Sequence, residues 1–183
     1  MEEKIVRSRR SQVTWKDFIS AAIYSPLIVI QFILTIFFYQ NFLNLDFVMY
    51  VGVIVWILSI YFAIAPMIIL KKRGRVPKGK SYVHTTTLVT NGLYGIVRHP
   101  QYTGGLLLII ALIMVSQHWI VVIAGIIALI VFYHDITRED KELIKIFGEQ
   151  YKRYMRRVPR TNFMLGLIRA AKRKGKHNRI KLV

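Results

Sequence analysis

Long apolar stretches separated by short polar segments are the dominant pattern along this chain of 183 residues. Residues 18 to about 39 and about 47 to 70 form two stretches, each longer than the roughly 20 residues with which a helix crosses the hydrocarbon core. Two shorter stretches follow, from about 100 to 117 and from about 118 to 133. Backbone groups inside a bilayer must hydrogen-bond within their own segment, so the pattern predicts four transmembrane helices in two hairpins.

The remaining segments predict other local structures. Residues 81–96, SYVHTTTLVTNGLYGI, are β-branched and polar with a turn at Asn91-Gly92, which predicts an ordered loop with a short extended piece. After residue 133, apolar residues recur with helical spacing on one face, which predicts an amphipathic helix ending at Val158-Pro159. The next segment, NFMLGLIRAAKRKGK, is amphipathic as well, and we expect it to lie on the headgroup surface.

Charge placement predicts the topology. The chain has 27 Lys and Arg against 9 Asp and Glu, a formal charge of +18. All of these basic residues lie outside the four apolar stretches, in 1–16, in 71–80, at Arg98 and from Arg138 onward. The positive-inside rule therefore places both termini and the central loop in the cytoplasm. The expected fold is an all-α integral membrane protein, N-in and C-in, with about four transmembrane helices plus C-terminal amphipathic helices.

Composition limits the kinds of binding partner that we expect. A basic chain can indicate nucleic-acid binding, but these basic clusters flank membrane spans, where they favour anionic headgroups. We therefore expect membrane lipids as partners and no nucleic acid. The absence of cysteine excludes disulfides, thiolate metal sites and a cysteine nucleophile, and we expect no metal site. The first apolar stretch is too long for a cleavable signal peptide. We expect one structural unit, with a basic arm and first hairpin in 1–80 and a candidate functional region, the loop, second hairpin and amphipathic helices, in 81–183.

Two pairs of ionisable residues mark the candidate site. Arg98 and His99 precede the third apolar stretch, and Glu139 and Asp140 follow the fourth by about one turn. If these two stretches form a hairpin, the pairs face each other at the mouth of the bundle, a common place for function in membrane proteins. A structural interpretation also exists, in which Arg98 reaches the headgroups and Glu139 pairs with a neighbouring lysine.

The segments LVTNGLYGIVRHPQYTGG and REDKELIKIFGEQYKRYMRRVPR carry a resemblance to a known family. Together they resemble the C-terminal signature of the isoprenylcysteine carboxyl methyltransferases and their phospholipid methyltransferase relatives. The resemblance covers residues 88–160. Residues 1–87 are similar only in hydropathy.

The resemblance implies an integral membrane methyltransferase that uses S-adenosyl-L-methionine. Its acceptor would be lipid-like or prenylated, with the active site facing the cytoplasm. Arg98 and Glu139 match catalytic positions, with Arg98 on the reacting carboxylate. The positions that match the cofactor site are Leu88, Val89, Tyr94, His99, Tyr102, Glu139 and Asp140. Asp140 stands where a glutamate is usual, and Arg138 stands where another acidic residue is frequent.

Two other functions remain open. His134 and Arg138, with the following F-G-x-x-Y pattern, also resemble the end of the NADPH-dependent sterol reductases, which are much longer. A non-catalytic membrane scaffold is the third possibility. The acceptor is equally open, because a prenylated cysteine carboxylate, an amine headgroup and a small apolar acid all fit. An amine would need a base, for which His99 is the candidate.

Overall fold

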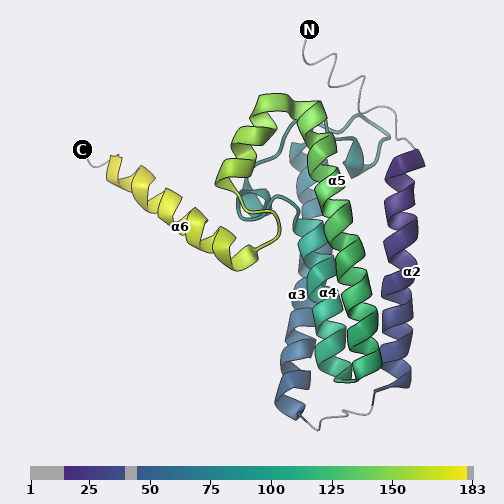
Figure 1. Ribbon diagram of the computed structural model, residues 1–183. Helices are drawn as coiled ribbons and strands as arrows, with labels where there is room; N and C mark the ends of the chain where they lie inside the picture. Colours follow the sequence, from purple (N-terminus) through teal and green to yellow (C-terminus); the bar gives the residue numbers. More distant parts are fainter. Residues whose placement is uncertain (1–14, 40–44, 181–183) are drawn as a thin grey trace.

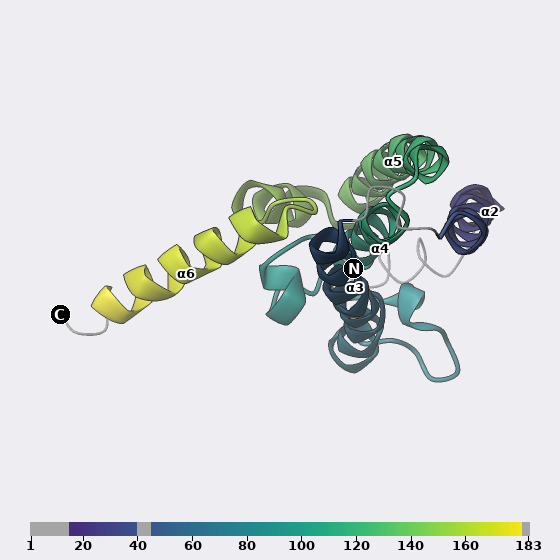
Figure 2. The same ribbon diagram turned by 90° about the horizontal axis from the view of Figure 1, so that it is seen from below.

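The computed structural model describes residues 15–39 and 45–180, and all regular structure within these ranges is helical. This confirms the all-α fold class for the part of the chain described. The expected basic arm of residues 1–16 lies almost entirely outside these ranges. Four helices form an elongated bundle, and a further helix projects from its flank (Figures 1 and 2). The bundle helices are α2 (Trp15–Phe37), α3 (Asp46–Arg73), α4 (Pro100–Ser116) and α5 (Trp119–Arg157), and the projecting helix is α6 (Phe163–Ile180).

Helix α4 is the centre of the bundle, because it packs against α2, α3 and α5. Its closest neighbour is α3, at a crossing built on glycine. A Cβ on Gly104 would lie 2.9 Å from the backbone nitrogen of Ala63 and 3.0 Å from the carbonyl oxygen of Ser59. On the other helix, a Cβ on Gly52 would lie 2.9 Å from Met114. Such small residues let two helix backbones approach closely in a lipid environment.

The apolar helices support a membrane protein. Among the described residues, α3 and α5 are long and apolar enough to cross a bilayer, judged by length and composition. Two shorter apolar helical segments accompany them, Ser25–Phe37 and Pro100–Ser116. Large aliphatic side chains such as Ile57 and Ile64 are more than half exposed on α3. Exposed aliphatic residues in this density suit a lipid environment rather than water.

The structure adds detail to two expectations from the sequence. Residues 81–96 form two short 3₁₀ helices, η1 (Tyr82–His84) and η2 (Gly92–Gly95), and no strand. The backbone is extended at Ser81, Thr85 and Asn91, which flank these helices. The amphipathic segment after residue 133 does not begin as a separate helix, because α5 runs from the apolar stretch into it, departs from helical angles only at Gly148 and ends at Arg157.

The reversal of α5 shapes the site. At Gly148 the backbone leaves helical geometry, with φ 56° and ψ −131°, and residues 149–157 turn back towards the bundle (Figure 1). This combination of angles is accessible almost only to glycine. The connection from α3 to α4 runs over the same end of the bundle. It is held by Val97, which is fully buried against Phe62 and Leu93.

Candidate active site

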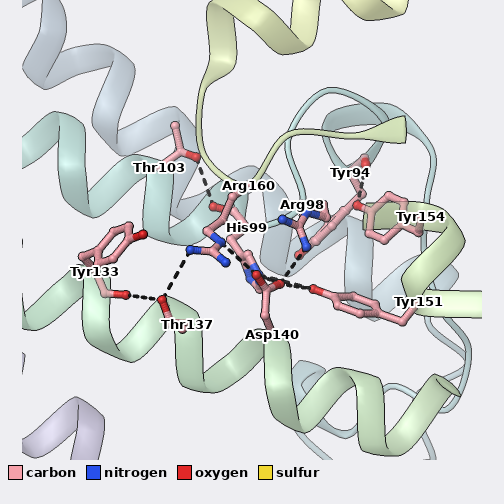
Figure 3. Close-up of polar contacts among 10 residues, drawn as sticks. All are labelled: Tyr94, Arg98, His99, Thr103, Tyr133, Thr137, Asp140, Tyr151, Tyr154 and Arg160. Carbon is pink, nitrogen blue, oxygen red and sulfur yellow. Dashed lines mark hydrogen bonds and ion pairs between the residues drawn. The ribbon is translucent and has the colours of Figure 1, made fainter. Parts of the chain in front are cut away.

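One carboxylate, that of Asp140, gathers the polar residues at this end of the bundle (Figure 3). Its Oδ1 atom lies 2.9 Å from Nη1 of Arg98, 2.8 Å from Nε2 of His99 and 2.6 Å from the Tyr151 hydroxyl. Its Oδ2 atom accepts a hydrogen bond of 2.8 Å from Nε of Arg160. The Asp140 residue is 3% exposed, so its carboxylate is shielded from solvent.

The cluster fixes the ionisation of Asp140, which lies beyond the apolar part of α5. Burial alone would raise the pKa of this carboxyl, because it disfavours the charged form. The hydrogen bond and charge of His99, the Tyr151 hydroxyl and the Arg98 guanidinium outweigh burial and lower the pKa to about 2. Burial and then the hydrogen bond to Asp140 raise the pKa of Tyr151. At neutral pH the carboxylate is therefore ionised and Tyr151 is a neutral donor.

Backbone pairing explains how distant segments meet here. The amides of Arg98 and His99 donate to the carbonyls of Pro159 and Arg160, at 2.9 Å and 3.1 Å. The segment after α5 thus lies alongside the start of α4. Pro100 begins α4 without the loss of a backbone hydrogen bond, because the first amide of a helix has no intrahelical acceptor.

A side-chain hydrogen bond also joins α5 to η2. The hydroxyl of Tyr154 donates to the carbonyl oxygen of Tyr94 at 2.5 Å (Figure 3). Burial raises the pKa of Tyr154, so this phenol remains a donor. The reversal at Gly148 brings Tyr151, Tyr154 and Arg160 back over the start of α4, and a straight α5 would carry all three away.

A pocket of about 120 Å³ lies beside the carboxylate cluster. Seven of the eight site residues expected from the sequence line it: Leu88, Val89, Tyr94, Arg98, His99, Tyr102 and Glu139. Asp140 is not among the lining residues and lies behind the wall that Arg98 and His99 form. The two polar pairs do come together, but the two acidic residues have different places: Glu139 borders the pocket and Asp140 holds its wall.

Arg98, which lines the pocket, has a donor without an acceptor in the described part of the chain. Its Nε atom is buried and has no hydrogen-bond partner among the described residues, while its Nη1 atom is bound to Asp140. A buried donor without an acceptor costs free energy unless a ligand supplies one. The pocket is therefore suited to an anionic group beside Arg98.

Aromatic side chains form much of the remaining wall. Tyr102 packs edge-on against His99, with ring centroids 5.7 Å apart, and its hydroxyl donates to Asp135 at 2.6 Å. Phe147, Tyr151 and Tyr154 also line the pocket. Aromatic faces attract cations, so the pocket joins an anion-binding donor to a surface that favours positive charge.

Several of these residues were not expected as site residues from the sequence. Tyr151 and Tyr154 are part of the F-G-x-x-Y-x-x-Y pattern, but helical spacing alone assigned them to a packing face. Arg160 closes the resembling segment, and that position was the only signal for its role. Arg138 forms an ion pair of 3.2 Å with Asp135, and neither Arg138 nor the exposed His134 lines the pocket.

The fold and the site define a helical membrane protein with a polar, aromatic pocket at one end of its bundle. Comparison with known proteins identifies the family. The phospholipid methyltransferase family matches residues 47–150, more than half of the chain. The chain therefore belongs to this family, and the resemblance drawn from the sequence is confirmed.

The curated relatives carry the name protein-S-isoprenylcysteine O-methyltransferase. The protein of Schizosaccharomyces pombe is 29% identical over 99 residues, which are 49% of this chain and 42% of the relative. The B protein of Arabidopsis thaliana is 33% identical over 100 residues, 50% of this chain and 51% of the relative. The human protein is 32% identical over 99 residues, 49% of this chain and 35% of the relative. The chain thus matches about half or less of each relative's length. No solved structure matches it significantly.

Proposed function

We propose that this protein is an integral membrane methyltransferase that uses S-adenosyl-L-methionine and methylates a carboxylate on a lipid-like or prenylated acceptor. The observation that carries the proposal is the pocket in which Arg98, with its unpartnered Nε, lies beside Tyr94, Tyr102 and Glu139. Membership of the family and the names of the relatives support the same activity.

The residues of the pocket fit this cofactor in charge. S-adenosyl-L-methionine supplies a methyl group on a sulfonium cation, which aromatic faces stabilise by roughly 0.5–2 kcal/mol. Glu139 is placed to accept from a ribose hydroxyl or an ammonium group. The cavity of about 120 Å³ is smaller than the roughly 300 Å³ at the lower end for ligand sites, so the cofactor would extend beyond it towards the loop of Leu88 and Val89.

Arg98 is the residue that we assign to the acceptor. Its bond to Asp140 fixes the guanidinium and leaves Nε free to donate to a carboxylate. Charge-assisted hydrogen bonds of this kind orient a planar anion well. Methylation of a carboxylate is a direct displacement that removes no proton, so the protein has to align the two partners and exclude water.

A carboxylate acceptor suits the site better than an amine. Methylation of an amine requires a base to take a proton, and the candidate was His99. The Nε2 atom of His99 lies 2.8 Å from Asp140 and 3.3 Å from the Tyr151 hydroxyl, so it is already engaged within the buried cluster. The reductase alternative is also not favoured, because neither His134 nor Arg138 borders the pocket.

The membrane arrangement that we propose has four spans, α2 to α5, with both ends of the chain and the pocket on the cytoplasmic side. The four apolar helices and the basic segments that flank them support this topology. In this arrangement, residues 81–183 provide nearly all of the pocket lining and residues 1–80 contribute Leu70. Membrane lipids would surround the bundle, and a lipid-like acceptor would enter from the bilayer.

Ligand binding tests the proposal. Calorimetry should show that the purified protein binds S-adenosylhomocysteine and does not bind NADPH. Arg98→Lys retains a charge opposite Asp140 but loses the planar fork. We expect it to lower turnover of a farnesylated cysteine carboxylate by at least about tenfold, equal to 1.4 kcal/mol, with the affinity for S-adenosylhomocysteine kept.

Glu139→Gln tests the residue assigned to the cofactor and should weaken S-adenosylhomocysteine binding. Glu142→Gln is the matched control, because Glu142 is one turn away on the same helix and pairs with Lys145 on the surface. Binding of NADPH alone would contradict the proposal, as would normal turnover by Arg98→Lys.

A further inference from the structure

Helix α6 is held in a defined orientation although it projects from the bundle (Figure 2). Its first residue, Phe163, packs edge-on against Phe62 of α3 with ring centroids 5.3 Å apart. One turn later Gly166 lies directly against the carbonyl of Ile96, with no space for a side chain. Arg173 donates hydrogen bonds to backbone carbonyls of η2 and of the end of α5. One face of α6 is thus fixed to the protein.

A second face of α6 is apolar and uncovered. Met164, Leu167 and Ile168 are 67%, 40% and 52% exposed, so the described chain leaves much of their surface uncovered. Their spacing of three and four residues, with Ala171 one turn further, places them along a single stripe. A stripe of this kind on a fixed helix requires an apolar environment outside the protein.

The depth of α6 indicates what that environment is. Phe62, which anchors the first turn, precedes Lys71 by nine residues on α3, or about 14 Å along the helix. The first turn of α6 therefore lies beside the apolar part of α3 and not beside its basic end. From there α6 rises towards the end of the bundle that carries the polar loops (Figure 1).

The charged residues of α6 lie towards the polar end of the bundle. The apolar residues of α6 come first and the basic residues later, beginning with Arg169, Lys172 and Arg173, and the segment 163–180 contains no acidic residue. Arg169 and Lys172 are exposed, on the side next to the apolar stripe. Apolar residues at acyl-chain depth with cations above them match an interfacial helix on an anionic membrane surface.

We propose that α6 is a docking helix for anionic lipid headgroups of the membrane that holds the bundle. Met164, Leu167 and Ile168 face the acyl chains, and Arg169 and Lys172 bind the headgroups. This interaction does not depend on methyl transfer. A second copy of the chain could also cover the stripe, but it would leave the basic side without an acidic counterpart on α6.

The chain has no cysteine, so a single introduced cysteine can be labelled specifically. Ile168→Cys is labelled with an environment-sensitive fluorophore and placed in phosphatidylcholine nanodiscs with or without phosphatidylglycerol and doxyl-labelled lipid. The matched control is Lys145→Cys, at an exposed position of α5 just before the reversal at Gly148. We expect doxyl lipid to quench the Ile168→Cys label at least about twofold more than the control label, and more strongly when phosphatidylglycerol is present.

Charge variants complete the test. Arg169→Gln with Lys172→Gln should remove the effect of phosphatidylglycerol. Lys145→Gln with Lys152→Gln removes the same charge from two surface ion pairs and should leave the effect unchanged. Equal quenching of the Ile168→Cys and Lys145→Cys labels would overturn the proposal. A shifted but unquenched label would also overturn it, because protein would then cover the stripe. Met164→Cys repeats the measurement if Ile168→Cys does not fold.

Discussion

At the scale of single residues, Asp140 organises the site without bordering the pocket. Its two oxygens receive donors from Arg98, His99, Tyr151 and Arg160, which come from three different parts of the chain. Each of these side chains is held by the same carboxylate, so a change at Asp140 alters all of them together. We therefore regard Asp140 as a positioning residue for Arg98 and His99.

Asp140→Asn tests this role. The amide keeps the shape but removes the charge and puts donors opposite buried donors, so we expect a loss of roughly 3–5 kcal/mol in unfolding free energy, as when a buried ion pair loses one partner. The measurement is thermal unfolding in detergent. Asp140→Glu keeps the charge and should retain the fold and part of the turnover, which a purely structural role would not require. Equal stability of Asp140→Asn and the parent protein would contradict the assignment.

The pH dependence of stability follows from the same carboxyl. The folded protein lowers its pKa from 3.8 to about 2, so the ionised form is favoured by folding. The stabilisation is complete above the unfolded value and is lost as the pH falls through the folded value. The melting temperature should therefore fall between about pH 4 and pH 2. In Asp140→Asn this part of the fall should be absent. An identical acid profile in both proteins would show that other groups cause it.

At the scale of elements, the reversal of α5 is the feature on which the site depends. Gly148→Ala tests it, because a Cβ at this position would meet nothing within 4 Å and the cost is therefore purely one of backbone conformation. We expect a penalty of roughly 1–3 kcal/mol and weaker S-adenosylhomocysteine binding, since Tyr151 and Arg160 would move away from Asp140.

The matched control for this prediction is Gly79→Ala. Gly79 also has a positive φ, 77°, and open space around it, but it lies in the loop after α3. We expect the control to lose stability and keep its ligand affinity. The two effects are separated by measuring unfolding and binding on each variant. Unchanged binding by Gly148→Ala would mean that the reversal is not required for the pocket.

The sequence predicts the helices well and the reversal not at all. The second apolar stretch was expected at about 47 to 70 and the helix is Asp46–Arg73, because hydropathy marks both ends and basic residues mark the second. The turn between α4 and α5 was also expected, and Gln117 there adopts a left-handed conformation with φ 52°. By contrast, the apolar spacing continues across Gly148 as in an unbroken helix. The reversal is visible only in the backbone angles of Gly148, and no sequence pattern predicts those angles.

At the scale of the whole molecule, a hairpin of α4 and α5 predicts that the Arg98-His99 and Glu139-Asp140 pairs meet. It does not predict which of the two acidic residues borders the pocket. Adjacent residues on a helix point about 100° apart, so either Glu139 or Asp140 could have faced the pocket. The rotation of α5 decides this, and it depends on packing such as that of Ile109 and Phe132. Arg160 could not be assigned from sequence either, because its role depends on the chain returning after α5.

The last prediction concerns how the molecule lies in the membrane. If α4 and α5 both span it, the turn between them and the polar end of α5 lie on opposite sides. Trp119, at the turn, is 60% exposed, and Lys141, beyond the apolar part of α5, is exposed as well, so either position accepts a single cysteine.

In intact cells, a membrane-impermeant maleimide should label Trp119→Cys and should leave Lys141→Cys unlabelled until the membrane is opened. Lys78→Cys, in the basic segment after α3, should behave as Lys141→Cys does, since the positive-inside rule keeps both in the cytoplasm. Labelling of Lys141→Cys in intact cells would reverse the orientation. Identical behaviour of the cysteines at positions 119 and 141 would show that α5 does not cross the membrane, and the acceptor would then have to reach the pocket from the surface instead of from the bilayer.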